Sequence, residues 1–279
     1  MFRSASAEDS RIVIVAAEGS RRNPLAGLWE YRELLYFLTW RDLKVRYKQT
    51  AFGLAWAVLQ PLLLMLVFSV SIGRIAGVAP GGIAYPLFAL TGLVPWTLFS
   101  QGVTGASNSL VGGESIITKV YFPRLIVPLA VIASFLPDFL VAFVLLLLIL
   151  SVGGVAPSAA ILALPVAVIA LLVTAIGVGS FLAALSVRYR DVRYAVPFLM
   201  QLWLFASPIV YASSLISPSL RIVYALNPLA GPLELFRWSL IGGAPPDASA
   251  AVSVAVSFVV LAIALGYFRR VERTFADVI

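Results

Sequence analysis

The side chains able to carry out acid–base, nucleophilic or metal chemistry are few. The 279 residues include no histidine and no cysteine, which excludes imidazole catalysis, thiolate nucleophiles, disulfides and the common zinc sites. The acid best placed for chemistry is Asp138, which follows Pro137 inside a long apolar run. A carboxylate in such a place is a functional site by default. Asp138 is therefore predicted to contact a transported substrate or a proton, or else to form a structural pair across helices.

A second group of candidate residues lies in the apolar segment 213–247. Glu234 and Arg237 are three residues apart and able to pair on one helix face, and Trp238 comes next. An enzyme needs paired carboxylates, or a nucleophile and a base, at one surface. The other acid of this segment, Asp247, follows two prolines in a predicted turn. The pattern favours a gate, or a surface cap with a local ion pair, over an active site.

The composition is that of a polytopic membrane protein. Hydrophobic residues make up 61% of the chain and charged residues 12%, about half the charged share of a soluble domain. Because a charge costs roughly 2.5–3.5 kcal/mol in the middle of a membrane helix, charge-free intervals mark the spans. The sequence predicts an all-α membrane protein with six transmembrane helices, at about 51–73, 85–110, 126–150, 161–186, 195–212 and 248–268.

The positions of the basic residues predict the orientation. Seventeen of the 20 Lys and Arg residues lie in segments that six spans place on one side of the membrane, together with both termini. Only Arg74, Arg221 and Arg237 fall on the other side. Basic residues are enriched in cytoplasmic loops, so the chain is predicted to be N-in and C-in, with the first span as its insertion signal. This distribution explains the net charge of +7 without a nucleic-acid partner.

The segments outside the spans divide into tails and an amphipathic helix. Residues 1–23 are predicted to form a flexible cytoplasmic tail, and residues 269–279 a shorter one. In residues 24–50 a helical period gathers charged side chains within one arc and apolar side chains largely opposite. This pattern predicts an amphipathic helix in the membrane interface, which serves either as a surface anchor or as a docking element for a cytoplasmic partner.

Two connections within the six-span domain, residues 51–268, are predicted to be functional. The cytoplasmic connection 112–124 combines aromatic and basic residues projecting toward the cytoplasm, which indicates either a protein contact or side chains at the lipid headgroups. The outer connection 213–247 is long yet apolar, and Pro218, Pro228 and Pro232 divide it. It is predicted to hold two short re-entrant or interfacial gate helices, near 218–226 and 232–241.

Four motifs follow one another along the predicted spans. They are Arg46-Tyr47-Lys48-Gln49-Thr50 with Gly53, Trp56, Gln60 and Pro61; Lys119-Val120-Tyr121-Phe122-Pro123-Arg124 with Pro128; Arg188-Tyr189-Arg190-Asp191-Val192 with Pro197 and Ser207-Pro208; and Asn227-Pro228 with Glu234 and Arg237. Together they resemble the permease subunits of ABC-2 type exporters for polysaccharides, the O-antigen, capsule and teichoic acid group. The resemblance covers about residues 24–275 and departs at Phe52, where the family often has leucine.

This resemblance implies a homodimer of permeases bound to two separate ATP-binding cassette subunits. The chain contains no Walker A motif, so ATP and Mg²⁺ are expected on the partner ATPase, and no cofactor or metal in this chain. By position in the family, the residues predicted to couple to the ATPase are Arg41, Lys44, Lys119, Tyr121, Phe122, Pro123, Arg124, Arg188, Arg190 and Asp191. The residues assigned in the same way to an outer gate are Asn227, Glu234, Arg237 and Trp238.

The substrate that the resemblance implies is a lipid-linked glycan, moved outward across a bacterial inner membrane. Sugar rings present apolar C–H faces that stack on aromatic rings, so aromatic side chains are candidates for the pathway. The residues predicted to line it are Trp56, Phe68, Phe88, Trp96, Phe99, Asp138, Trp203, Phe205 and Tyr211. The alternatives are an ABC-2 exporter of a small lipid or drug, and an integral-membrane enzyme that processes a glycan or lipid.

Overall fold

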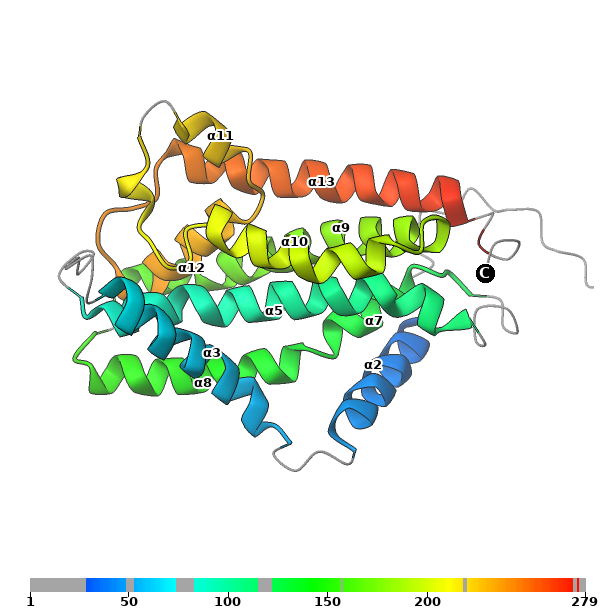
Figure 1. Cartoon of the computed structure of the whole chain (residues 1–279), viewed down its shortest axis with the longest axis horizontal. Helices are drawn as coiled ribbons and strands as arrows, with labels where there is room; N and C mark the ends of the chain where they lie inside the picture. Colours follow the sequence, from blue (N-terminus) through cyan, green and yellow to red (C-terminus); the bar gives the residue numbers. More distant parts are fainter. Residues whose placement is uncertain are drawn as a thin grey trace, which may run out of the picture.

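The chain folds into a bundle of helices. A computed structural model describes residues 29–48, 53–73, 83–114, 122–156, 158–217, 220–272 and 275. Within those residues there is no β-strand, which confirms the predicted all-α fold. Most of the long helices run side by side along the longest axis of the molecule, whereas α2 (Arg32–Tyr47), at one end, and α3 (Ala55–Phe68) lie obliquely to them (Figure 1).

The long helices coincide with the predicted spans to within a few residues. They are α3 (Ala55–Phe68) with the π-helical turn η1 (Ser69–Gly73), α5 (Tyr85–Gly112), α7 (Ile126–Ala133) with α8 (Leu136–Val152), the 3₁₀ turn η3 (Ala159–Ala163) with α9 (Leu164–Arg188), α10 (Val192–Ala206) and α13 (Ala248–Glu272). Among the described residues, three segments are long and apolar enough to cross a membrane: Ile126–Val152, Ala159–Arg188 and Ala248–Glu272. Ala55–Ser71 and Val192–Ala206 are shorter apolar helices.

The outer connection contains the two short helices that its prolines predict. After the 3₁₀ turn η4 (Ser213–Leu215) come α11 (Arg221–Ala225) and α12 (Ala230–Ile241). The helix before this connection, α10, ends at Ala206 rather than at residue 212 as predicted. The reason is Ser207, which is extended because the residue before a proline avoids helical backbone angles.

Helix α5 lies at the centre of the bundle. It packs against α9, α7, α3, α8, α10 and α12, and side chains such as Leu93, Phe99 and Val103 are fully buried. Glycines allow the neighbouring helices to approach closely, as is common in membranes. A Cβ added at Gly177 of α9 would lie 3.0 Å from the backbone of Leu261 in α13. The α9–α13 contact therefore depends on the absence of a side chain there.

Helix α2 is held to the bundle by a second apolar cluster. Leu38 is buried there against residues of α5, the start of α7 and the end of α13, among them Phe122 and Phe268. On its other side α2 exposes large aromatic side chains, including Tyr36 and Trp40. Such a surface is typical of a helix that lies at a lipid–water boundary.

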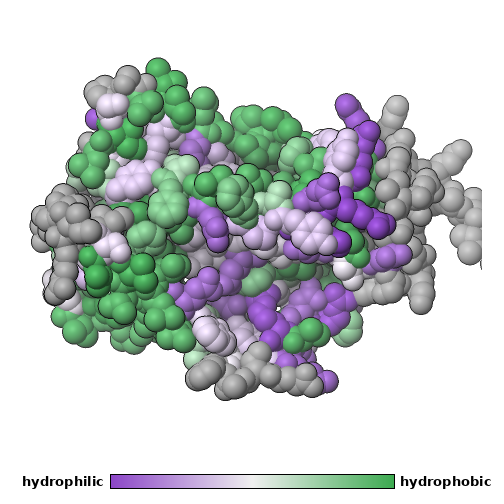
Figure 2. All heavy atoms as spheres, in the orientation of Figure 1, coloured by the Kyte–Doolittle hydropathy of each residue, from purple (hydrophilic) through white to green (hydrophobic). Residues whose placement is uncertain are grey.

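The connections separate into two groups at opposite ends of the bundle. The last turns of α5, α9 and α13 and the first turns of α7 and α10 lie at the α2 end, whereas α11 and α12 lie at the other end (Figure 1). On the face shown in Figure 2, hydrophilic side chains gather toward the α2 end and hydrophobic ones toward the α11 and α12 end.

Candidate functional site

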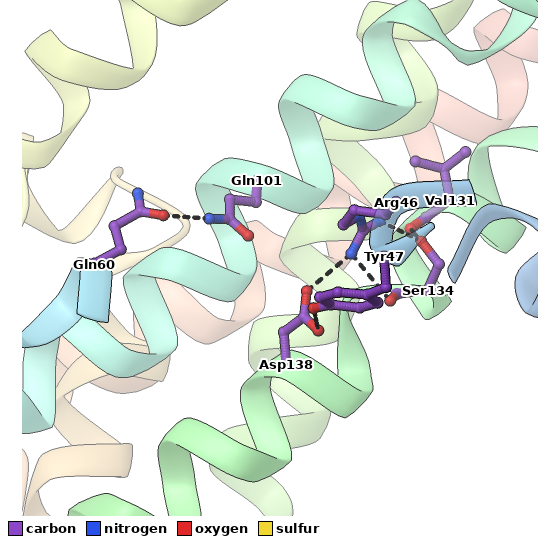
Figure 3. A network of polar contacts seen from close by, with 7 residues as sticks. All are labelled: Arg46, Tyr47, Gln60, Gln101, Val131, Ser134 and Asp138. Atoms are coloured by element: carbon purple, nitrogen blue, oxygen red, sulfur yellow. Dashed lines mark hydrogen bonds and ion pairs between the residues drawn. The ribbon is translucent and has the colours of Figure 1, made fainter. Parts of the chain in front are cut away.

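A buried ion pair joins α2 to the break between α7 and α8 (Figure 3). Arg46 Nη1 lies 2.8 Å from Asp138 Oδ2, and Arg46 Nη2 donates to Ser134 Oγ at 2.7 Å. The Tyr47 hydroxyl donates to the other Asp138 carboxylate oxygen. The Arg46 guanidinium also stacks on the ring of Phe135, 3.5 Å from its centroid. We call these five residues the Arg46 cluster.

The Arg46 cluster supports the structural interpretation of Asp138. The Asp138 side chain is buried and both of its carboxylate oxygens accept from α2 residues, which is the predicted pair across helices, while its assignment to the pathway stays a prediction. Arg46 Nη1 also donates to the Ser134 carbonyl at 3.2 Å, where the helix is broken. Sequence reasoning missed Arg46 and Tyr47 as site residues. The signal was their place in the first family motif.

A pair of glutamines links α3 to α5 on the same view of the molecule (Figure 3). Gln101 Nε2 donates to Gln60 Oε1 at 2.6 Å, and the pair lies on the surface of the single chain. Amides are costly to expose to lipid without partners. This polar pair therefore belongs on a surface that faces water or another protein.

The predicted coupling residues of the 112–124 connection are only partly described, because Lys119 and Tyr121 lie outside the described residues. Phe122 is buried at 4% exposure, so the prediction that its side chain projects toward the cytoplasm is wrong. The reason is the second apolar cluster, which Phe122 joins. Arg124, which follows Pro123, contacts the end of α13 through two hydrogen bonds. Its backbone N–H donates to Glu272 Oε1 at 2.7 Å, and its Nη1 donates to the Glu272 carbonyl.

The other predicted coupling residues lie at the surface of the α2 end. Arg188, Arg190 and Asp191 are exposed at the turn between α9 and α10. On α2, Arg41 forms an ion pair with the adjacent Asp42 at 2.8 Å, and Lys44 Nζ lies over the ring of Trp40. The structure thus brings these basic residues to one end of the bundle, as the topology prediction requires.

At the opposite end, Arg237 of α12 reaches into the bundle. Its Nη2 donates to the Ile209 carbonyl at 2.8 Å, its Nε donates to Thr91 Oγ1 at 3.3 Å, and its guanidinium lies 3.8 Å from the ring centroid of Phe88. Burial lowers the pKa of Arg237 to about 10, so it stays charged at neutral pH. One side chain thus connects α12, α5 and the segment after α10.

The possible Glu234–Arg237 ion pair is not among the salt bridges of the described residues. Arg237 instead donates to the buried Ile209 carbonyl, because a buried backbone carbonyl needs a hydrogen-bond donor. Glu234 Oε1 is buried without a hydrogen-bond partner among the described residues. Burial raises the pKa of the Glu234 carboxyl. A hydrogen bond from Ser213 and the charge of Arg237 act in the opposite direction and lower it in part.

Asn227 and Trp238, the other predicted gate residues, have structural partners. Asn227 Oδ1 accepts from Trp203 Nε1 at 3.0 Å, and its Nδ2 donates to Ser207 Oγ at 2.9 Å. Trp238 Nε1 donates to the Gly243 carbonyl at 3.3 Å. Asn227 therefore joins the end of α10 to the start of α12, and it fixes the outer connection in place.

The aromatic residues predicted to line the pathway have different environments. Phe88, Trp96 and Phe99 are buried within a single chain, and Phe88 also lines a small pocket at the α11 and α12 end, so the assignment of these residues to the pathway stays a prediction. Ring packing in the core explains the burial, since Trp96 and Phe99 lie 5.7 Å apart and Phe99 packs edge-on against Trp203.

The remaining pathway candidates are more accessible. Trp56 and Phe205 are exposed, and Phe205 packs edge-on against Phe68. Trp203 and Tyr211 line an apolar groove of about 930 Å³ between α9, α10, α13 and the outer connection. Of the predicted aromatic set, these are the side chains available to a substrate, a lipid or a second copy.

The bundle of broken and apolar helices is the architecture of a membrane protein, and comparison with known proteins gives its class. The sequence model of the ABC-2 type transporter family matches residues 33–241, and the chain belongs to that family.

Relatives within the family are similar over most of their length. The O-antigen export system permease protein RfbA of Myxococcus xanthus is 31% identical over 253 residues, which cover 90% of this chain and 96% of the relative. A protein of the same name from Klebsiella pneumoniae is 28% identical over 88% of this chain and 95% of the relative. The polysialic acid transport protein KpsM of Escherichia coli is 25% identical over 73% of this chain and 79% of the relative.

Proposed function

We propose that this chain is the permease subunit of an ABC exporter that moves a polysaccharide or related cell-envelope glycan outward. The observation that carries the proposal is the end-to-end similarity to an O-antigen export permease, which covers 96% of that relative. Family membership and the three membrane-length apolar helices make the chain a multi-pass protein of a bacterial inner membrane. The lipid-linked form of the glycan is part of this proposal.

In this proposal a second type of subunit supplies the energy for transport. Because the chain has no Walker A motif, ATP hydrolysis with Mg²⁺ takes place on two separate ATP-binding cassette subunits. Two copies of the permease form the pathway between them. The exposed Gln60–Gln101 pair supports this arrangement, since a second copy or a water-filled path would cover its polar atoms.

Copurification tests the proposed function. We expect the full chain, isolated from its native membrane in mild detergent, to bring with it a stoichiometric ATP-binding subunit whose hydrolysis rises when a lipid-linked glycan is added. Repeated recovery without an ATPase, even with the candidate ATPase co-expressed, would contradict the proposal. Stimulation by small lipids but not by glycans would instead identify a small-lipid exporter, which the apolar groove of about 930 Å³ would accommodate.

We also propose that six spans cross the membrane, with both termini in the cytoplasm. The alternation of the connections between the two ends of the bundle supports this topology (Figure 1). Tyr189→Cys and Ala244→Cys variants are expected to react with a membrane-impermeant maleimide from opposite sides, Ala244→Cys from outside intact spheroplasts and Tyr189→Cys after the membrane is opened. The natural chain has no cysteine and serves as the blank. Labelling of both variants from one side would refute the topology.

A further inference from the structure

A small pocket with several polar lining residues lies at the outer end of the bundle, beside the larger apolar groove, with which it shares Ile216 and Tyr224. Its volume is about 300 Å³, at the lower end of the range for small-molecule sites. Residues of α12, Phe88 of α5, Tyr224 of α11 and the segments before and after them line it. We call it the outer pocket. The residues that carry the argument are Phe88, Ser213, Tyr224, Glu234, Trp238 and Asp247.

The outer pocket contains a hydrogen-bond acceptor that the described chain leaves unused. Glu234 Oε1 is buried, and no described residue donates to it. An ionised carboxylate accepts several hydrogen bonds, and a buried acceptor without a donor is costly. Burial raises the pKa of the Tyr224 hydroxyl, so this neighbour stays protonated and able to donate. Acceptor and donor groups thus line the same small space.

The charges and rings around the pocket restrict the class of ligand. Two acids, Glu234 and Asp247, are balanced by Arg221 and Arg237, so the lining has no net charge. Arg237 is already engaged with the Ile209 carbonyl and Thr91, and is not free to clamp a phosphate. The rings of Phe88 and Trp238 also line the pocket. A neutral ligand with hydroxyl donors and an apolar C–H face satisfies all of these features.

We propose that the outer pocket binds one neutral saccharide unit, with its hydroxyl groups donating to Glu234 and its ring packing on aromatic side chains. The inference rests on the proposed function, because the saccharide is then a unit of the exported glycan as it leaves the bundle. An ordered water could satisfy Glu234 alone. It would not require rings beside the carboxylate, and the experiment below separates the two.

Protection of a cysteine at the pocket wall tests the proposal on the full chain in lipid nanodiscs. An Ala244→Cys variant on the cysteine-free background, which places the thiol in the pocket lining, is treated with a maleimide in the presence of free glucose, galactose or mannose. At about ten times the dissociation constant of a bound hexose, mass action leaves about a tenth of the sites free, so modification is expected to slow about tenfold. Leu215→Cys is the matched control, since Leu215 is exposed and outside the pocket lining, and its rate is expected not to change.

A second set of variants assigns the binding to Glu234. Adding Glu234→Gln to Ala244→Cys is expected to weaken hexose protection at least about tenfold, because hydrogen bonds to a charged acceptor contribute that much to affinity. Glu33→Gln, which removes an exposed acid on α2 at the opposite end of the bundle, is expected to leave protection unchanged. Equal protection by glucose 6-phosphate would contradict the neutral class of ligand.

Failure of the outer-pocket proposal and failure of the proposed function give different experimental results. Absence of protection by all three hexoses, with an ordered water on Glu234 in an experimental map, would overturn the pocket while copurification and export still stood. Loss of ATPase association with hexose protection intact would overturn the proposed function instead. If Glu234→Gln fails to accumulate, the protection assay on Ala244→Cys alone still decides whether a saccharide binds.

Discussion

Replacing Arg46 with methionine is expected to lower the free energy of unfolding by about 3 kcal/mol. Removal of one partner from a buried ion pair typically costs about 3–5 kcal/mol, because the other charge is left buried without compensation. The Arg46 side chain keeps 27% of its exposure and that of Asp138 11%, which places the loss at the low end of this range. Thermal unfolding of the purified chain in detergent, followed by circular dichroism, measures the change.

The double variant Arg46→Met with Asp138→Leu provides the control. Because it removes both charges, its loss of stability is expected to be smaller than the sum of the two single losses. Strict additivity would mean that Arg46 and Asp138 do not interact, and would contradict the Arg46 cluster. Lys48→Met, an exposed basic residue two positions away, is expected to change stability by less than about 0.5 kcal/mol.

Arg237→Ala is expected to have the second large effect, again about 3 kcal/mol. The substitution leaves the Ile209 carbonyl without its donor, removes a bond to Thr91 and removes a cation stacked on Phe88. Arg237→Lys is expected to recover less than half, since one ammonium group does not reproduce the planar guanidinium. The same unfolding measurement applies.

The control for Arg237 is Arg221→Ala. Arg221 lies at the same end of the bundle and lines the same outer pocket, but its side chain is exposed. We expect its replacement to change stability by less than about 0.5 kcal/mol. Equal losses for the two substitutions would show that net charge at this end, and not the contacts of Arg237, sets the stability.

The positions of the helices were predictable because hydrocarbon excludes charge. Each charge-free interval became a helix or a pair of helices, and the prolines of the outer connection marked its two short helices. The position of Asp138 as an isolated buried acid was also predictable. Its partner was not, because Arg46 comes from a helix 92 positions earlier in the chain, and no local spacing connects the two residues.

The surroundings of individual side chains were the least predictable part. Phe99 and Phe205 are the same residue type in apolar helices, yet Phe99 is fully buried and Phe205 is 61% exposed. Glu234 and Arg237 have the spacing of an ion pair, but Arg237 bonds a carbonyl from another segment. Both outcomes depend on which helices pack together, and a single sequence carries that information only weakly.

The attachment point of Arg46 has a mechanical consequence. Arg46 contacts Ser134 and Phe135, where α7 has ended and α8 has not yet begun. A displacement of α2 would therefore act at the junction between α7 and α8 and not on one continuous helix. We expect a displacement of α2 to change the angle between α7 and α8, because the contact lies between these helices and not within either of them.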